Sequence, residues 1–433
     1  MARRHFHAAT LLFAGLAAAP IPAFAGGFYL QEQSPKETGR ALSGGAAAGD
    51  DPSTIYFNPA AMTNLPGIQL SAGGVALMAS AHQRNLGTTR SVPGSAVQVP
   101  VSGGQGGNPF EKVIPVPSFY ASAQMSDRLW LGIGVNAPFG LKLEYDDDFF
   151  GRYDALYTDL KTYNIQPSAA YRLTDTLSVG GGVDVQYVKV ELTNALPQLS
   201  PLLADGHARV KGNDWSIGWN AGLFFKSGAT QVGVHYRSAI SHGLRGEQTL
   251  SGLLGPIAGA NGTVDARAPL NLPDIATVSL TQSLTPRLRA MLTARWYNWS
   301  RFTSIAITAE GGSTSVKELN YHDSYSFSVG GEYDVSEKLT LRAGTMFDRT
   351  PTNKQFLTAR VPDGDRAWLS GGATWNMSPS FALNLSYAHV FVEEGNIIRT
   401  DSYFPAPATV SARTLSRTSG NADQIAASLT ARF

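Results

Sequence analysis

Residues 424–433, with the sequence QIAASLTARF, decide the fold of this chain. Their apolar side chains recur at every second position, and the residues between them are small or polar. In an extended strand this alternation turns one face toward lipid and the other toward a polar lumen. The sequence also ends on the aromatic Phe433, a feature of outer-membrane barrels, so we expect the barrel-assembly machinery to recognise this residue.

The same period of two returns in residues 288–297, where it decides which face meets the lipid. Leucines and alanines alternate there with Arg289 and Arg295. An arginine that faces lipid near the membrane midplane costs about 2–4 kcal/mol. We therefore expect both arginines to face the lumen. By strand phase these two and Arg342 would suit a carboxylate in the lumen, although arginines that face the lumen are ordinary in barrels.

Fourteen segments carry strand patterns, and the connections between them alternate in length. Turn-forming residues fill the short connections, such as Thr174-Asp175 and Ser378-Pro379-Ser380. The long connections lie at about 80–117, 137–161, 190–212, 241–266, 301–323, 349–366 and 393–421. Short turns on one rim and long loops on the other are typical of barrels in the outer membrane of Gram-negative bacteria. The sequence predicts an all-β fold, a 14-stranded antiparallel transmembrane β-barrel over residues 68–433.

The N-terminus carries an export signal. Arg3 and Arg4 precede an apolar run over 8–19, and Ala23 and Ala25 offer small side chains at the two positions that a signal peptidase reads. The run of about a dozen residues is too short to span ~30 Å of hydrocarbon. We expect residues 1–25 to be a signal peptide. Beyond them no uninterrupted apolar stretch is long enough for a transmembrane helix.

Composition and motifs argue against several classes of protein. The formal net charge is +1, so no basic excess favours a nucleic-acid partner. The sequence has no cysteine, and its histidines lack the spacing of metal ligands. We find no P-loop and no hydrolase motif. The sequence therefore predicts a protein that is not an enzyme and that needs no metal or cofactor. An outer-membrane enzyme such as a lipase is the remaining alternative, and it would need a serine nucleophile and a base that face the bilayer.

Residues 26–67 differ from the rest of the mature chain because they lack the period of two. They are rich in Gly, Ala and Ser between residues 39 and 49. A fourteen-stranded barrel leaves an open lumen, and small residues allow a compact plug to pack inside it. A disordered periplasmic tail is the other possibility. Asn58-Pro59-Ala60 is more typical of a structural turn than of a ligand contact.

A series of motifs carries a resemblance to a known family. They are Gly26-Gly27-Phe28-Tyr29-Leu30, Gly39-Arg40-Ala41, Asn58-Pro59-Ala60, Asn136-Ala137-Pro138-Phe139-Gly140-Leu141, Leu272-Pro273-Asp274, Asn298-Trp299-Ser300 and Pro362-Asp363. In this order the motifs resemble the FadL family of outer-membrane transporters, which includes long-chain fatty acid channels and aromatic-hydrocarbon channels. The resemblance covers the whole mature chain.

The resemblance implies a mechanism and a set of site residues. Residues 26–67 would form a plug, called the hatch. A hydrophobic ligand would be captured among the outer loops and would pass to an internal site beside the hatch. It would then leave sideways into the outer-membrane lipid through a kink in the third strand. The implied ligand contacts are Phe28 and Leu30, and the implied kink is Pro138, Phe139 and Gly140.

The residues themselves also allow simpler interpretations of these two features. Phe28 and Leu30 are equally suited to packing within a plug. Pro lacks a donor for strand pairing and Gly marks bulges, so Pro138 and Gly140 fit either a kink or the plain end of the third strand.

Two long connections are unusually rich in leucine, although loops that face water are usually polar. One interpretation is that they pack on each other and cap the barrel. The other is that they form an apolar capture groove for the ligand. The candidate groove residues are Leu196, Leu199, Leu202, Leu203, Leu250, Leu253 and Leu254.

The sequence thus predicts passive uptake of a hydrophobic small molecule, with long-chain fatty acids as the first candidate. Uptake of monoaromatic hydrocarbons by the same mechanism is the alternative. A general diffusion porin is a weaker rival, because more than 40 residues precede the first strand and leucine-rich loops do not suit polar solutes.

Overall fold

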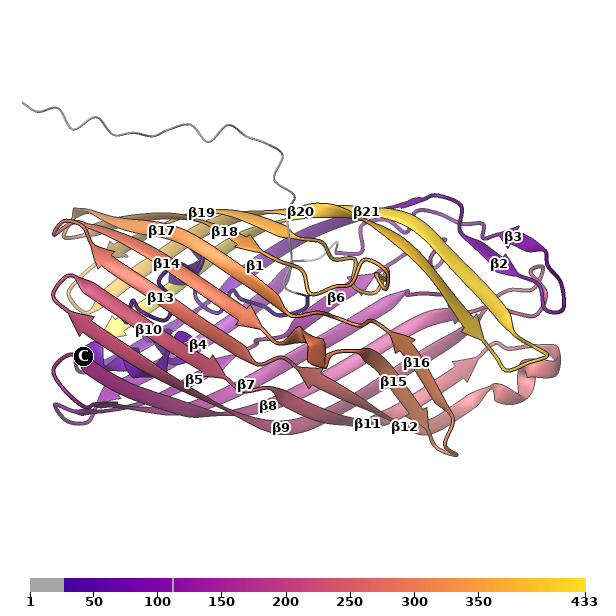
Figure 1. The fold of residues 1–433 in the computed structure, drawn as a ribbon, viewed down its shortest axis with the longest axis horizontal. Helices are drawn as coiled ribbons and strands as arrows, with labels where there is room; N and C mark the ends of the chain where they lie inside the picture. Colours follow the sequence, from indigo (N-terminus) through magenta and orange to yellow (C-terminus); the bar gives the residue numbers. More distant parts are fainter. Residues whose placement is uncertain (1–26, 111–112) are drawn as a thin grey trace, which may run out of the picture.

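The computed structural model describes residues 27–110 and 113–433, and it forms a closed antiparallel barrel (Figure 1). The expected signal peptide lies outside the described residues. No helix in the described ranges is long and apolar enough to span a membrane. The first and last strands pair from Gln69–Arg432 to Asn85–Ser416 and close the wall.

Fourteen strands build the wall, as predicted, and five of them are interrupted along their length. In chain order they are β1 (Ile68–Asn85), β4 (Ile114–Gln124), β5 (Leu129–Asn136) with β6 (Gly140–Glu144), β7 (Tyr157–Arg172), β8 (Leu177–Leu196), β9 (Gly206–Ser227), β10 (Thr230–Arg237) with β11 (Ile240–Ser251), β12 (Gly262–Leu272) with β13 (Ile275–Ser283), β14 (Leu288–Tyr297) with β15 (Ser304–Ala309), β16 (Thr314–Glu318) with β17 (Ser324–Ser336), β18 (Leu339–Asp348), β19 (Arg366–Asn376), β20 (Phe381–Tyr403) and β21 (Val410–Arg432). A small hairpin, β2 (Thr89–Ser91) and β3 (Gln98–Pro100), extends from one loop.

Several long connections are shorter than expected, because the strands continue beyond the predicted ends. The predicted loop 190–212 is mostly strand, since β8 runs to Leu196 and β9 begins at Gly206. Likewise, β20 and β21 pair as far as Tyr403 and Val410. Outside the lipid both faces of a strand meet polar surroundings, so the apolar period of two disappears while backbone pairing continues. Figure 1 shows these long hairpins at one end and the short turns at the other.

The two faces of the wall follow the predicted alternation. Ile425 and Leu429 are exposed on the outer surface, whereas Gln424 and Ser428 are buried toward the lumen. The predicted orientation of the arginines is also confirmed. Arg295 is buried and donates to the carbonyl of Leu42 inside the barrel.

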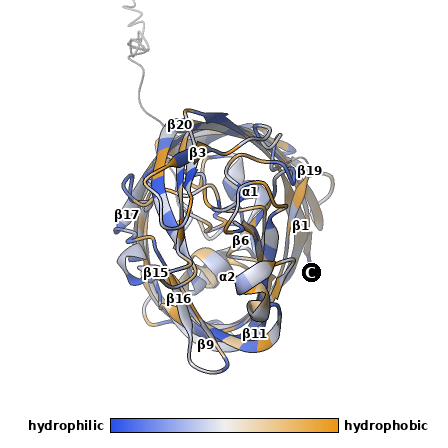
Figure 2. Ribbon diagram, turned by 90° about the vertical axis from the view of Figure 1, so that its right-hand side faces the viewer, coloured by the Kyte–Doolittle hydropathy of each residue, from blue (hydrophilic) through white to orange (hydrophobic). Residues whose placement is uncertain are grey.

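The segment 27–67, which we call the hatch segment, lies inside the barrel (Figure 2). It contains two one-turn helices, α1 (Pro35–Thr38) and α2 (Thr54–Phe57), and the 3-10 helix η1 (Pro59–Asn64). The wall approaches it so closely that a Cβ on Gly233 would lie 1.8 Å from the carbonyl oxygen of Ala46. Glycine in the wall therefore provides the room for the hatch backbone.

Asn58 holds the turn that precedes η1. Its side-chain oxygen accepts from the amide of Ala60 at 3.1 Å. Its Nδ2 donates to the carbonyls of Ala46 at 2.8 Å and Leu223 at 2.9 Å. Pro59 occupies the first turn of η1, where a missing N–H costs nothing. In this structure the motif therefore forms a turn within the hatch segment.

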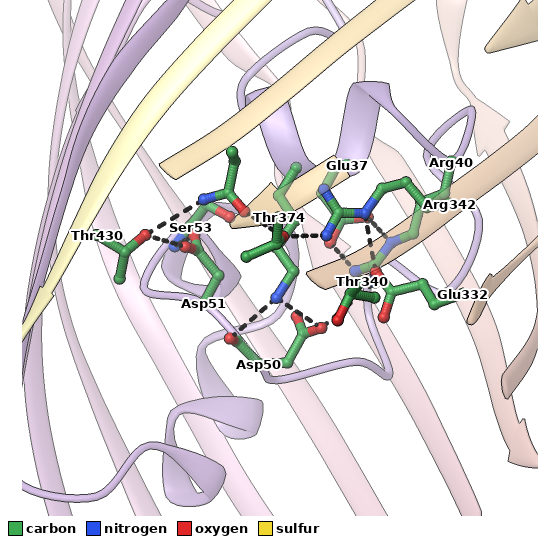
Figure 3. Close-up of polar contacts among 12 residues, drawn as sticks. Glu37, Arg40, Asp50, Asp51, Ser53, Glu332, Thr340, Arg342, Thr374 and Thr430 are labelled. Carbon is green, nitrogen blue, oxygen red and sulfur yellow. Dashed lines mark hydrogen bonds and ion pairs between the residues drawn. The ribbon is translucent and has the colours of Figure 1, made fainter. Parts of the chain in front are cut away.

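A cluster of buried charges fastens the hatch segment to the wall (Figure 3). Arg40 pairs with Glu37 of the hatch segment and, at 2.9 Å, with Glu332 of β17. Lys36 pairs with Asp50 at 2.9 Å. Burial raises the pKa of the Asp50 carboxyl, but Lys36 and Arg40 outweigh this effect and hold the pKa well below its usual range. Arg342 also pairs with Glu332, at 3.1 Å, so three cations face three carboxylates in this cluster.

We predict that Arg40→Ala loosens the hatch segment. The change leaves Glu37 without its buried partner, and breaking a buried pair in this way costs about 3–5 kcal/mol. Urea unfolding of the refolded protein measures the loss of stability, and ion conductance in planar bilayers measures leakage past the hatch.

The matched control is Arg209→Ala, which removes a surface pair with Glu191. An exposed pair of this kind is worth at most about 1 kcal/mol. If Arg40→Ala behaves like this control and adds no conductance, the charge cluster does not hold the hatch.

Candidate functional site

A large cavity opens beside the start of the hatch segment. This side cavity has a volume of about 870 Å³. Its lining includes Leu30 from the hatch segment, Pro117 from β4, and Lys142 and Lys161 from the wall. It therefore connects the interior of the barrel with the region between β4 and β6.

A smaller and mainly apolar cavity of about 80 Å³ lies on the other side of Phe28. We call it the inner cavity. Leucine and isoleucine side chains from five wall strands surround it, namely Leu160, Leu192, Leu244, Leu270 and Ile305. Phe28 lines both cavities, as do Leu141, Leu160 and Val361, so the two cavities adjoin at these four side chains.

An aromatic cluster holds Phe28 in place. Its ring centroid lies 4.9 Å from that of Trp299, 5.4 Å from that of Phe302 and 6.1 Å from that of Phe139, all in edge-to-face geometry. Such pairs contribute about 0.5–1.5 kcal/mol each beyond the burial of their surface. The amide of Gly27 donates to Asp363 at 3.1 Å, which ties the first described residue to an outer loop. Phe28 and Leu30 both face cavities, and a direct contact with ligand stays a prediction.

The third wall strand is broken where the sequence has Pro138. β5 ends at Asn136 opposite Asn164, and β6 resumes at Gly140 opposite Lys161. Residues 137–139 on this strand therefore face only residues 162–163 on β7. This extra residue makes a β-bulge. Because the strand resumes as β6, residues 137–139 form a kink within a strand and not its end.

The wall is unpaired beside this kink. β4 pairs with β5 only as far as Phe119 opposite Val135. Beyond that point β4 pairs only with β1 on its other side. The hatch segment covers the kink from within, since Leu30 donates to the carbonyl of Pro138 at 2.8 Å and Gly140 donates to that of Phe28 at 3.0 Å. We call the space between β4 and residues 137–140 the wall opening.

Gln33 completes this arrangement, and the sequence reasoning missed it. Its Nε2 donates to the carbonyl of Ala137 at 3.0 Å, and its Oε1 accepts from the amide of Ala137 at 3.3 Å. The side-chain amide thus replaces a strand partner at that residue. A single glutamine in a plug gives no sequence signal for this role, because the role depends on the tertiary position of Ala137.

A buried cation lies at the edge of the inner cavity. Arg360 is 5% exposed and donates to the carbonyls of Tyr157, Asp154 and Thr193 and to the hydroxyl of Thr158. No carboxylate of the described residues forms an ion pair with it. Burial lowers the pKa of the guanidinium, against the opposing effect of the Asp154 carboxylate. The site therefore holds a positive charge that is bonded to neutral oxygens.

The three arginines that the sequence suggested have other partners. Arg289 and Arg342 bond Glu332 in the cluster that fastens the hatch segment, and Arg295 bonds Leu42 and Gln31. Neither cavity is lined by them. Arg360 was missed because it follows a wall strand in a loop that carries no regular pattern.

The leucine-rich segments pack on each other at the outer end of the barrel. Leu196 and Leu253 are buried together, with Leu199 and Leu250 packed against them. These contacts favour the interpretation that the two segments pack on each other. Three leucines remain open to solvent on this cap and are available for ligand capture, which stays a prediction: Leu202, Leu203 and Leu254.

The chain is similar to known transport proteins along most of its length. A family model described as outer membrane protein transport protein (OMPP1/FadL/TodX) matches residues 16–433. Outer membrane protein P1 of Haemophilus influenzae is 32% identical over 419 residues, which cover 88% of this chain and 89% of that protein. The long-chain fatty acid transport protein of Escherichia coli K12 is 27% identical over 440 residues, which cover 91% of this chain and 95% of that protein.

Solved structures share the fold. A FadL homologue from Pseudomonas aeruginosa superimposes with a TM-score of 0.83 at 24% identity, over 94% of this chain and all of that one. The toluene transporter TodX of Pseudomonas putida superimposes with a TM-score of 0.68 at 18% identity, over 94% of this chain and all of that one.

We predict that Phe28→Ala weakens the binding of oleate by about tenfold or more, because burying a side chain of this kind is worth about 1.5–3 kcal/mol. Equilibrium binding of radiolabelled oleate to the purified barrel measures the change. The matched control is Tyr29→Phe, which keeps the ring and removes only the hydrogen bond to Tyr56. Equal affinities for the two variants and the parent would exclude Phe28 from the ligand site.

Proposed function

Because this chain belongs to the OMPP1/FadL/TodX family of outer membrane transport proteins, we propose that it takes up long-chain fatty acids by lateral release into the membrane. It is a transporter of hydrophobic compounds in the outer membrane of a Gram-negative bacterium, and not an enzyme. Long-chain fatty acids as the substrate and lateral release as the route are what we propose.

The buried cation beside an apolar cavity is the observation that favours a fatty acid as the substrate. A fatty acid is an alkyl chain that ends in a carboxylate. The inner cavity offers leucine and isoleucine side chains for the alkyl chain, and Arg360 supplies a positive charge at its edge. A guanidinium that is buried without a direct ion pair is costly, and a ligand carboxylate would lower that cost.

The route follows the order of the apolar surfaces. Leu202, Leu203 and Leu254 would receive the alkyl chain at the outer end. The ligand would then occupy the inner cavity, pass Phe28 into the side cavity, and leave through the wall opening. The concentration gradient of the ligand is sufficient to drive this passage, because each stage offers an apolar environment.

A monoaromatic hydrocarbon is the second candidate, and the size of the inner cavity favours it. A volume of about 80 Å³ suits a compact ligand better than a long chain. The toluene transporter of Pseudomonas putida has the same fold. A hydrocarbon would need no cation, however, and so would leave Arg360 without a role in binding.

Arg360→Gln distinguishes the two candidates. For a fatty acid the change removes a charge-assisted contact worth about 1.5–3 kcal/mol, so we expect oleate to bind about 10–100-fold more weakly. Binding of oleyl alcohol and of toluene, which carry no charge, should stay the same. The measurement is equilibrium binding to the purified barrel.

Two further variants serve as controls. Arg360→Lys keeps the charge and should retain part of the affinity for oleate. Lys354→Gln removes an exposed charge from the same outer loop and should have no effect. Loss of binding for all three ligands with Arg360→Gln would indicate a structural role for this arginine. Unchanged oleate binding would overturn its assignment to the carboxylate.

The capture step is tested with neighbouring leucines that differ in burial. Leu254 is 49% exposed and Leu253 is 1% exposed. Leu254→Ser should slow oleate uptake at low ligand concentration and leave the melting temperature unchanged. Leu253→Ser creates a cavity with a buried hydroxyl and should lower stability by about 2–5 kcal/mol. If Leu254→Ser leaves uptake intact, the cap does not capture ligand.

A further inference from the structure

The strand edges at the wall opening are unpaired, whereas strand edges in a membrane are normally paired with a neighbouring strand. In lipid, each N–H or C=O without a partner is costly, and barrels close to remove such edges. Two neighbouring strands with free edges should therefore pair and close the gap. Something in this chain must prevent that pairing.

The hydrogen bonds at the C-terminal end of β4 show which of its residues point their backbone groups toward β1 and which toward β5. The amide of Gln124 donates to the carbonyl of Gly67 on the β1 side, and the amide of Met125 donates to Leu129 on the β5 side. The pairing of β4 with β1 continues from Gln69–Ser122 to Leu77–Ile114 without a shift in register. Successive residues of a strand point their backbone groups to opposite sides. Odd-numbered residues of β4 therefore point toward β5 and the opening.

The odd-numbered residues at the opening are Pro115 and Pro117. Both are part of β4, and Pro115, Pro117 and Ala137 all line the side cavity. If the pairing of Phe119 with Val135 continued in register, Pro117 would face Ala137 and Pro115 would face Phe139. Proline has no N–H, so neither position can donate to the strand opposite. The even-numbered neighbour Val116 still pairs with Val75 on the β1 side.

The facing edge is occupied as well. Gln33 bonds both backbone groups of Ala137. The bulge turns Phe139 toward β7, where its amide donates to the hydroxyl of Thr162 at 2.9 Å and its carbonyl accepts from the amide of Thr162 at 3.1 Å. Neither edge thus offers the other a complete set of partners.

We propose that Pro115 and Pro117 are positioning residues that hold the wall opening permanently open. They deny β4 the two donors that it would need to pair with the third strand. The carbonyls of Pro115 and Pro117 also point toward the opening. Carbonyls without a partner are tolerated more easily than unpaired N–H groups. On this view the opening is a fixed window, and no strand has to unzip for a ligand to leave. The inference rests on the proposed lateral release.

The test is the double variant Pro115→Val/Pro117→Val, which restores both donors on β-forming residues. Two new backbone hydrogen bonds would shift the equilibrium between the open and the closed wall toward the closed form by roughly tenfold or more. We expect uptake of radiolabelled oleate by cells to fall by about that factor, whereas binding of oleate to the purified barrel stays within about twofold of the parent. A general loss of structure would lower both.

The matched control is Pro286→Val, which makes the same replacement in an exposed turn between β13 and β14 and should change neither quantity. If the double variant does not assemble, Pro117→Val restores a single donor opposite Ala137 and should lower uptake in the same direction by about threefold or more. Uptake at the parental rate in an assembled variant would overturn the inference. Absence of oleate binding and uptake in the parent chain would overturn the proposed function instead.

Discussion

The rule that every backbone polar group in lipid needs a partner governs this structure. Closing fourteen strands into a ring satisfies the rule along most of the described wall, but not beside the kink of the third strand. There the chain meets the requirement by other means. Leu30 and Phe28 of the hatch segment bond the kink, and Gln33 replaces a strand partner at Ala137. The hole in the wall and the plug in the lumen are thus parts of one arrangement.

The hatch segment has two attachments of different kinds. Its middle is fastened by balanced buried charges around Arg40 and Glu332. Its start is held by backbone bonds and by the aromatic rings around Phe28. Moving the middle would separate charges in the lumen, which is costly. The start bonds the edge of the third strand at the opening and lines both cavities, so it shapes the proposed route of the ligand.

The barrel was the most predictable part of the chain. A period of two and the alternation of short and long connections specify fourteen strands, because lipid imposes an apolar face on each of them. The family resemblance, from motifs such as Asn58-Pro59-Ala60, is also confirmed. Strand ends outside the lipid were missed, since no apolar face is required there. β4 is an instructive case, because Pro115 and Pro117 put its start into a predicted loop. Arg360 and Gln33 acquire their positions only through tertiary contacts.

A fixed opening is compatible with a working transporter only if the ligand, and not the wall, controls release. Moving a methylene between water and an apolar site changes the free energy by about 0.8 kcal/mol, but moving it from an apolar cavity into lipid changes it little. On the proposed route, an alkyl chain would therefore leave the side cavity for the bilayer without a large barrier. If the ligand is a fatty acid, as proposed, the contact between its carboxylate and Arg360 would hold it back. The affinity for the ligand would then depend mainly on that polar contact and on Phe28, which lines both cavities, while the window itself would need no motion.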